Sequence, residues 1–201
     1  MAADLVVLAT RNAAKLRELA RILGSSVRVA GLAEFPGAPD VAETGATFEE
    51  NALLKARAIA TYTGLLAVAD DSGLCVDALN GMPGVLSARW AGAHGDDRAN
   101  LDLVLAQVAD VPDARLGARF VCAAALVLPS DGSREWVVTR HVEGRLTRTP
   151  RGSGGFGYDP IFVPDGFDVT TAQMAPEAKD AISHRGRAFR ALAPFITGRL
   201  T

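Results

Sequence analysis

Residues 66–74 read LAVADDSGL, and the fold prediction depends on this stretch. An apolar run of strand length leads directly into two neighbouring carboxylates, Asp70 and Asp71, and then into a hydroxyl and a glycine. We predict a buried strand that ends at the acids, because open α/β sheets bind ligands at the carboxyl ends of such strands. Asp-Ser-Gly is also ordinary turn chemistry, so a plain turn is the alternative interpretation.

The composition is that of an ordinary globular protein, with 49% apolar and 22% charged residues among 201. The length suits one well-buried domain, predicted over residues 1–201. A net charge of −2 gives no electrostatic reason to expect nucleic acid as a partner. The chain lacks an apolar run of ~20 residues and its first four residues lack signal-peptide features, so we expect a cytoplasmic protein without a membrane partner. Cys75 and Cys122 lie in apolar runs and are predicted to be buried thiols.

The beginning of the chain predicts a strand, a tight turn and a helix. Residues 5–9 are apolar, Thr10-Arg11-Asn12 follow, and leucines then recur at helical spacing. Asn12 is a natural N-cap, and the free N–H groups of the first turn would attract an anion that Lys15 also binds. The glycines of a Walker A loop are absent, and a capped helix with a surface lysine is the alternative.

A capping box predicts the start of a second helix. Thr47 is followed three residues later by Glu50, which predicts a helix through residues 52–60. Glu43 lies on the preceding loop, and Lys55 lies about two turns into the helix. A solvated glutamate is the alternative for Glu43 taken alone.

Later segments complete a mixed sheet. Residues 120–128 and 135–140 have strand patterns, and the turn at 129–132 between them is short enough to make the pair antiparallel. Residues 98–109 are predicted to be a helix. We therefore predict an α/β fold with a mixed central β-sheet flanked by helices.

A glycine-rich segment and the last helix supply further candidates. Residues 150–162 contain four glycines that let the backbone approach a ligand, and Phe156 and Tyr158 could stack on a flat heterocycle. The helix that begins near Ser183 carries His184 and Arg185 as hydrogen-bond donors. Only three lysines stand beside eighteen arginines, and all three fall in candidate segments: Lys15, Lys55 and Lys179.

Together these features are the parts of a metal-dependent nucleotide hydrolase. Asp70 or Asp71 would act as a base, and Glu43 would complete a cation site. Two adjacent acids at the edge of a core repel each other and lose solvation, and a divalent cation lowers both costs. Lysines and the start of a helix would bind the phosphates of a nucleotide, while the aromatic residues would bind its nucleobase.

At this point the sequence resembles the inosine triphosphate pyrophosphatases, which hydrolyse non-standard purine nucleotides. Five motifs spanning nearly the whole chain carry the resemblance: Thr10-x-Asn12-x-x-Lys15, Glu43-Thr44-Gly45-x-Thr47-Phe48-x-Glu50-Asn51-Ala52-x-x-Lys55-Ala56, Asp70-Asp71-Ser72-Gly73-Leu74, Gly154-Gly155-Phe156-Gly157-Tyr158-Asp159-Pro160 and Ser183-His184-Arg185. The resemblance implies hydrolysis of ITP, dITP and XTP to the monophosphate and pyrophosphate with Mg²⁺. It also implies a homodimer whose subunits have two lobes around an active-site cleft.

The resemblance implies a role for each matching residue. Asp71 would be the general base and, with Glu43, would hold the metal, while Asp70 supports the pair. Lys55 belongs to the catalytic group and, with Lys15, neutralises the triphosphate. The remaining substrate-binding candidates are Thr10, Arg11, Asn12, Ser72, Phe156, Gly157, Tyr158, Asp159, Lys179, His184 and Arg185.

Two other classes of protein deserve comparison. A regulatory module that binds nucleotides without turnover would not need Asp71, so the intact acidic pair argues against it. In a glycosidase, Asp70 and Asp71 would act as opposed acid and base. Neighbouring strand residues point to opposite faces, which disfavours that arrangement.

Overall fold

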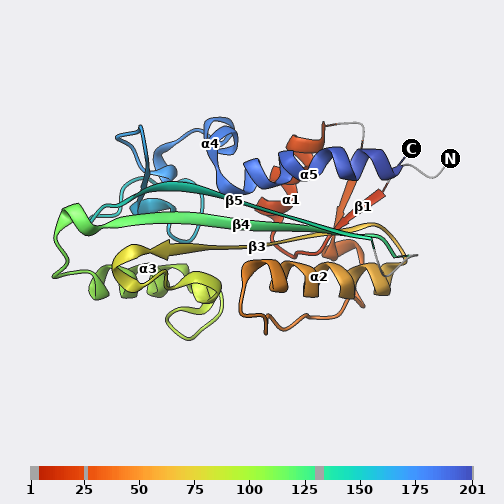
Figure 1. Cartoon of the computed structure of the whole chain (residues 1–201), viewed down its shortest axis with the longest axis horizontal. Helices are drawn as coiled ribbons and strands as arrows, with labels where there is room; N and C mark the ends of the chain where they lie inside the picture. The colour runs from red at the N-terminus through yellow and green to blue at the C-terminus, as the bar shows by residue number, and fades with distance from the viewer. Residues whose placement is uncertain (1–4, 25–26, 130–133, 201) are drawn as a thin grey trace. The chain divides into compact units, whose positions relative to one another are not determined.

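The computed structural model describes residues 5–24, 27–129 and 134–200, and its strands form one sheet (Figure 1). The strand order is β2-β1-β3-β4-β5-β6. The strands are β1 (Leu5–Leu8), β2 (Arg28–Gly31), β3 (Ala67–Val76), β4 (Gly117–Val127), β5 (Glu135–Leu146) and β6 (Phe162–Pro164). β2 and β3 pair with β1 in parallel, whereas β6 pairs with β5 antiparallel, so the predicted mixed sheet is confirmed. Most of the predicted turn at 129–132 lies outside the described residues.

The described helices are α1 (Ala13–Leu23), α2 (Phe48–Thr63), α3 (Asp97–Gln107), α4 (Pro176–Ile182) and α5 (His184–Leu200). α1 and α2 begin directly after the predicted capping residues, Asn12 and Thr47. Asn12 Oδ1 accepts the Lys15 N–H at 3.3 Å, and Thr47 Oγ1 accepts the Glu50 N–H at 3.2 Å. Among the described residues, no helix has the length and apolar character needed to cross a bilayer.

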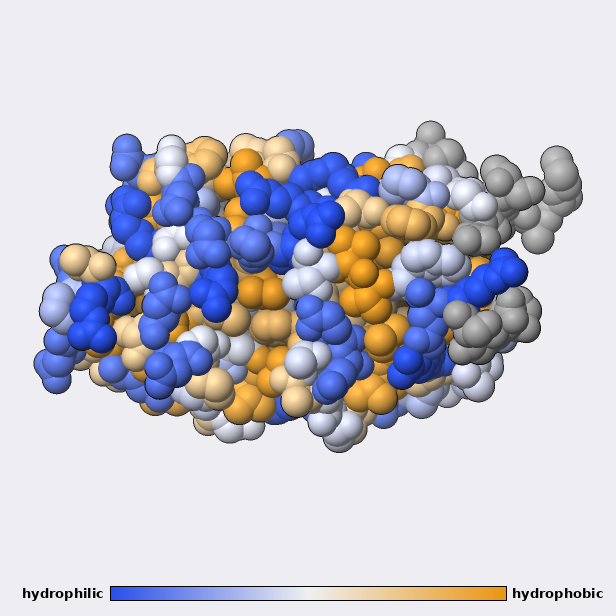
Figure 2. Space-filling view, viewed as in Figure 1, coloured by the Kyte–Doolittle hydropathy of each residue, from blue (hydrophilic) through white to orange (hydrophobic). Residues whose placement is uncertain are grey.

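The chain divides into two compact units. Unit 1 comprises Met1–Asp71, Cys122–Arg140 and Arg185–Thr201, and unit 2 comprises Ser72–Val121 and His141–His184. Strands β3, β4 and β5 each contribute residues to both units. Hydrophilic and hydrophobic side chains are intermingled on the face drawn in Figure 2.

Successive strand residues in unit 1 pack into different cores, because side chains alternate between the two faces of a sheet. Val6, Leu8 and Val68 pack with residues of α1 and α5. Val7, Ala67 and Ala69 pack with residues of α2. The first core also contains Leu19, Leu23, Cys122, Ala124, Leu126, Phe189, Leu192 and Ile196, and the second contains Ala52, Ala56, Ile59, Ala60, Ala123, Ala125 and Val127.

Strand β3 does not end at the acids, so that part of the prediction was wrong. It continues to Val76 because its later apolar residues, Leu74 and Val76, are buried in the core of unit 2. β1 ends at Leu8, which lies opposite Val68. The acids therefore lie just past the carboxyl end of the parallel neighbour β1, which keeps them at a ligand-binding edge of the parallel strands.

Unit 2 has a core of its own. Residues of β3 and α3 pack there with the end of the glycine-rich segment and with β6; the fully or nearly buried members include Leu74, Val76, Leu101, Val104, Tyr158, Ile161 and Phe162. Cys75 and Cys122 are buried thiols that form no disulfide, as predicted.

Candidate active site

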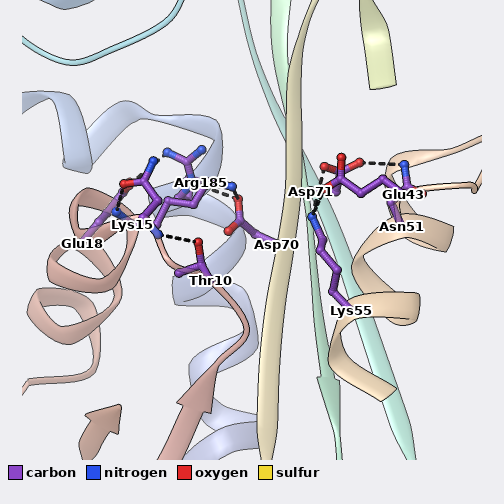
Figure 3. A network of polar contacts seen from close by, with 10 residues as sticks. Thr10, Lys15, Glu18, Glu43, Asn51, Lys55, Asp70, Asp71 and Arg185 are labelled. Carbon is purple, nitrogen blue, oxygen red and sulfur yellow. Dashed lines mark hydrogen bonds and ion pairs between the residues drawn. The ribbon is translucent and has the colours of Figure 1, made fainter. Parts of the chain in front are cut away.

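Asp70 lies at the centre of a buried ion network on the α1 and α5 side of unit 1 (Figure 3). Its Oδ2 atom lies 2.9 Å from Lys15 Nζ and 3.1 Å from Arg185 Nε. Arg185 also donates through Nη1 to Glu18 Oε2 at 3.2 Å. The network thus joins α1, β3 and α5 through charge-assisted hydrogen bonds.

The surroundings of Asp70 favour its ionised form. Burial alone would raise the pKa of this carboxyl, but the cations Lys15 and Arg185 outweigh burial and lower the pKa far below its usual range. Asp70 is therefore a permanent anion, suited to holding cations in place.

Asp71 points to the other side of β3, toward α2 (Figure 3). Its Oδ1 atom lies 3.3 Å from Lys55 Nζ, and the same ammonium lies 2.6 Å from Glu43 Oε1. Asn51 donates its side-chain amide to Asp71 Oδ2 at 3.1 Å. Both Asn51 and Lys55 come from α2, four residues apart, so they share one helix face.

The surroundings of Asp71 have the opposite effect on its acidity. Burial raises the pKa of Asp71, Lys55 lowers it, and the nearby Glu43 carboxylate raises it again, with a net upward shift. A carboxylate with a raised pKa is a stronger proton acceptor at neutral pH. For Lys55, burial lowers the pKa, but the carboxylates of Asp71, Asp70 and Glu43 outweigh burial and keep the amine charged.

Asn51 is a site residue to which the sequence analysis gave no role. Its side chain is fully buried and connects two parts of the site, because Oδ1 accepts the Gly45 N–H at 2.8 Å while the amide nitrogen binds Asp71. Only one amide orientation satisfies both partners, since a carboxylate cannot donate and a backbone N–H cannot accept. A Cβ at Gly45 would lie 2.8 Å from Asn51 Oδ1 and 2.6 Å from Glu50 Cβ, so this position accepts only glycine. The sequence signal that could have identified Asn51 is its position four residues before Lys55, on the same face of the predicted helix.

The turn before α1 has the hydrogen bonds of a capped helix start. Thr10 Oγ1 accepts the Asn12 N–H at 3.1 Å, and Asn12 caps the helix. Arg11 is exposed and donates through Nη2 to the Ala38 carbonyl at 3.3 Å. Lys15 lies in the first turn of α1, so its ammonium adds positive charge to that of the helix N-terminus.

In unit 2 the glycine-rich segment is organised by Asp159. This buried carboxylate accepts the Phe156 N–H on Oδ2 at 2.8 Å, and Lys179 Nζ binds the same oxygen at 2.5 Å. The Lys179 ammonium lies 5.5 Å from the centre of the Phe156 ring, which is 38% exposed. The structure thus presents one aromatic ring and one cation next to each other.

The other predicted base-binding residues of unit 2 are less accessible. Tyr158 is buried in the core and donates its hydroxyl to the Ser87 carbonyl at 2.8 Å, so its ring is not available for stacking. His184 is buried and stacks on Phe120 with ring centres 4.9 Å apart. Gly157 donates its N–H to Asp97 Oδ2 at 2.8 Å. Ser72 is half-buried on β3.

Arg185 occupies a different environment from the one expected for a base-contacting residue. It is 5% exposed and lies in unit 1, bound to Asp70 and Glu18. Glu18 was not singled out from the sequence, although its position three residues after Lys15 places both on one face of α1. The geometry supports a role for Arg185 in holding Asp70.

The acidic side chains on the α2 side fit a Mg²⁺ site. Glu43 and Asp71 converge on one ammonium, which shows that their carboxylates face a common cationic position. Within the described part of the chain there is no cluster of three or more acidic, histidine or cysteine ligands. Two carboxylates suit Mg²⁺, which takes its other ligands from water and substrate phosphates.

The mixed α/β fold, with acids paired to lysines just past the carboxyl end of the parallel strand β1, is that of an α/β enzyme. The chain belongs to the Ham1 family, whose model matches residues 6–195.

Relatives of known name cover nearly the whole chain. The dITP/XTP pyrophosphatase of Nocardia farcinica is 63% identical over 195 residues, covering 95% of this chain and 94% of the relative. That of Streptomyces coelicolor is 60% identical over 194 residues, covering 95% and 96%.

Solved structures resemble the fold as well. The nucleoside-triphosphatase / dITP/XTP pyrophosphatase of Mycobacterium abscessus superposes with a TM-score of 0.77 at 57% identity, covering 94% of this chain and 99% of that one. A HAM1 protein from Coxiella burnetii gives a TM-score of 0.87 at 41% identity, covering 96% and 98%.

We predict that Asp70→Asn lowers the free energy of unfolding at neutral pH by about 3–5 kcal/mol, because it removes the anion that binds the buried Arg185 and the half-buried Lys15. The folded-state pKa of Asp70 is depressed, so its contribution is complete above the unfolded pKa, near 3.8, and is lost as pH falls toward the folded value. Urea unfolding at neutral and acidic pH checks this: the wild type should lose more stability on acidification than the variant. Asp102→Asn, in an exposed pair with Arg98, is the control, and an equal loss in the Asp70 and Asp102 variants contradicts the prediction.

We also predict that Asn51→Leu lowers the free energy of unfolding by about 1–3 kcal/mol, because the Gly45 N–H and the Asp71 carboxylate each lose a partner. Hydrogen exchange should accelerate at residues 43–47, the loop that carries Glu43. Asn51→Asp keeps the acceptor for Gly45 and should preserve protection there while placing a second anion against Asp71. Unchanged exchange in folded Asn51→Leu protein would refute the bridging role.

Proposed function

We infer that this chain hydrolyses dITP and XTP, together with ITP, to the nucleoside monophosphate and pyrophosphate. The observation that carries this inference is the convergence of Asp71 and Glu43 on the Lys55 ammonium, just past the carboxyl end of the parallel strand β1. Relatives at 63% and 60% identity over 95% of the chain are dITP/XTP pyrophosphatases. Such an enzyme removes non-standard purine nucleotides from the nucleotide pool.

In this proposal Asp71 accepts the proton of the attacking water. The hydrogen bond from Asn51 fixes the direction of its carboxylate, so that one oxygen can face the water. Glu43 and Asp71 would hold Mg²⁺, which when bound supplies positive charge that stabilises the leaving pyrophosphate. Asp70 supports the site by anchoring Lys15 and Arg185.

Positive groups of unit 1 would bind the triphosphate. Lys15 and Lys55 are partly accessible, with side chains 18% and 13% exposed. The N–H groups at the start of α1 add donors that need no charge of their own, and Thr10, Arg11 and Asn12 shape that turn.

Residues of unit 2 would bind the purine. Phe156 is the proposed stacking ring because it is exposed, and Lys179, held by Asp159, is the neighbouring donor. Gly157, Tyr158 and His184 shape the surrounding backbone and core, while Ser72 follows the acids directly. A contact between Arg185 and the base stays a prediction from the sequence.

Three broader expectations belong to the same proposal. The proposed substrates are nucleotides of the cell's own pool, which supports a cytoplasmic location. The resemblance to the pyrophosphatases supports a homodimer, which light scattering of the purified protein tests. We also propose that residues 1–201 act as one domain, so that both units unfold in one transition.

The deciding experiment measures pyrophosphate release from a panel of nucleoside triphosphates with and without Mg²⁺. We expect rapid, Mg²⁺-dependent release from dITP, XTP and ITP, and slow release from ATP. Binding of dITP without turnover would indicate a regulatory module and overturn the proposal.

Asp71→Asn should lower kcat for dITP by at least about 100-fold, because an amide cannot take the proton from water. The variant should remain folded, since Asn is of the same size. Steady-state kinetics and urea unfolding check both points, with Asp102→Asn as control. Near-normal turnover in folded Asp71→Asn protein removes Asp71 from the mechanism.

Glu43→Gln should raise the Mg²⁺ concentration that gives half-maximal rate, because the amide is a weaker ligand for a hard cation than the carboxylate. Titration of the dITP rate with Mg²⁺ measures this directly. Glu34→Gln, which changes an exposed acid of unit 1 paired with Arg28, is the control. Superimposable titrations of the Glu43 variant and the wild type exclude this role.

A further inference from the structure

A buried threonine contacts the carboxylate that organises the glycine-rich segment. Thr171 begins the 3₁₀ helix η7 (Thr171–Gln173), is 5% exposed, and lies with its Oγ1 atom 2.8 Å from Asp159 Oδ1. The same hydroxyl lies 3.1 Å from the Asp159 backbone carbonyl. A hydroxyl has one proton, and the ionised carboxylate is both the closer and the stronger acceptor. Thr171 therefore donates to Oδ1.

The two carboxylate oxygens of Asp159 accept hydrogen bonds from different donors. Oδ2 accepts the Phe156 N–H at 2.8 Å and the Lys179 ammonium, whereas Oδ1 receives the Thr171 hydroxyl. Donors on both oxygens fix the rotation of the carboxylate plane. With Oδ1 released, the plane can turn, and the bonds to Phe156 and Lys179 lose their alignment.

The glycine-rich backbone fits closely against this carboxylate, so a rotation of the carboxylate plane would disturb the segment itself. Gly155 has φ +73°, and a Cβ there would lie 2.8 Å from Asp159 Cγ and 2.9 Å from Lys179 Nζ. Backbone and carboxylate are thus fitted closely together, and only glycine permits this approach.

The short helix η7 is itself held firmly. Thr170 caps it in a reciprocal pair with Gln173, and the Thr170 hydroxyl donates to the Arg151 carbonyl at 2.7 Å. Ala172, the next residue of η7, accepts the Gly154 N–H at 2.9 Å through its carbonyl. Helix η7, which carries Thr171, therefore also forms hydrogen bonds with the backbone of the glycine-rich segment.

We propose that Thr171 is a positioning residue that holds the Asp159 carboxylate, and through it Phe156 and Lys179, in the arrangement that receives the purine. The proposal rests on the proposed function for what the arrangement binds. Thr171 contacts no substrate in this account. Its effect is on how well the ring and the ammonium are placed before the nucleotide arrives, which lowers the cost of binding.

The variant that tests the proposal is Thr171→Val, which keeps the side-chain shape and removes the donor. Because Phe156 and Lys179 would contact the base in ground state and transition state alike, we expect KM for dITP to rise about tenfold or more with kcat unchanged. Thr171→Ser keeps the hydroxyl and should restore the wild-type KM. Thr147→Val is the matched control, since its hydroxyl lies in unit 2 and contacts only the nearby Thr149 carbonyl among the hydrogen bonds described.

Hydrogen exchange of residues 152–158 gives a second measurement that needs no activity. Exchange should be faster in Thr171→Val than in the wild type, the Ser variant and the Thr147 control. If Thr171→Val does not fold, Thr171→Ala takes its place in both measurements.

The outcomes separate this inference from the proposed function. An unchanged KM, or a fall in kcat with KM preserved, overturns the positioning role. Failure of Ser to restore KM also overturns it. A wild-type protein that releases no pyrophosphate from any triphosphate refutes the proposed function, and the exchange comparison then decides alone whether Thr171 holds the segment.

Discussion

The alternation of side chains along β3 is the constraint on which the candidate site depends. Asp70 and Asp71 are neighbours in sequence, yet a strand must send them to opposite faces. Each acid therefore has its own helix and its own lysine: Lys15 of α1 for Asp70, and Lys55 of α2 for Asp71. The two surroundings explain why one dipeptide contains both a permanent anion and a carboxylate of raised pKa: Lys15 and Arg185 outweigh burial at Asp70, whereas burial and the Glu43 carboxylate outweigh Lys55 at Asp71.

The local features of the fold could be predicted from the sequence because their causes are local. Asn12 and Thr47 cap helices through atoms three residues away, and the helix that opens at His184 follows its own apolar spacing. The mixed sheet was likewise predicted from strand patterns along the chain, whereas the contact between Glu43 and Lys55 was not predicted. Family membership rests on motifs that run in order along the chain.

Other features depend on residues far apart in sequence, and no pattern in the chain revealed them. β3 continues past the acids because its later residues are buried in a second core, which a strand-end motif does not show. Tyr158 was predicted to stack on a ligand, but its hydroxyl donates to the Ser87 carbonyl and its ring packs in the core of unit 2. The partners Glu18 and Arg185 are separated by 167 positions, so their ion pair is visible only in three dimensions.

The two faces of the sheet in unit 1 differ in the bulk of their side chains. The core toward α1 and α5 is built mainly of leucine and valine, with Phe189 and Ile196 from α5, whereas the core toward α2 is built largely of alanine. Substitutions are therefore restricted in opposite ways on the two faces: smaller side chains are unfavourable on the first, and larger ones on the second. Shortening a side chain opens a cavity on the first face, while lengthening one on the second pushes α2, and with it Lys55, away from β3. The alanines hold the helix at the distance that the lysine can reach.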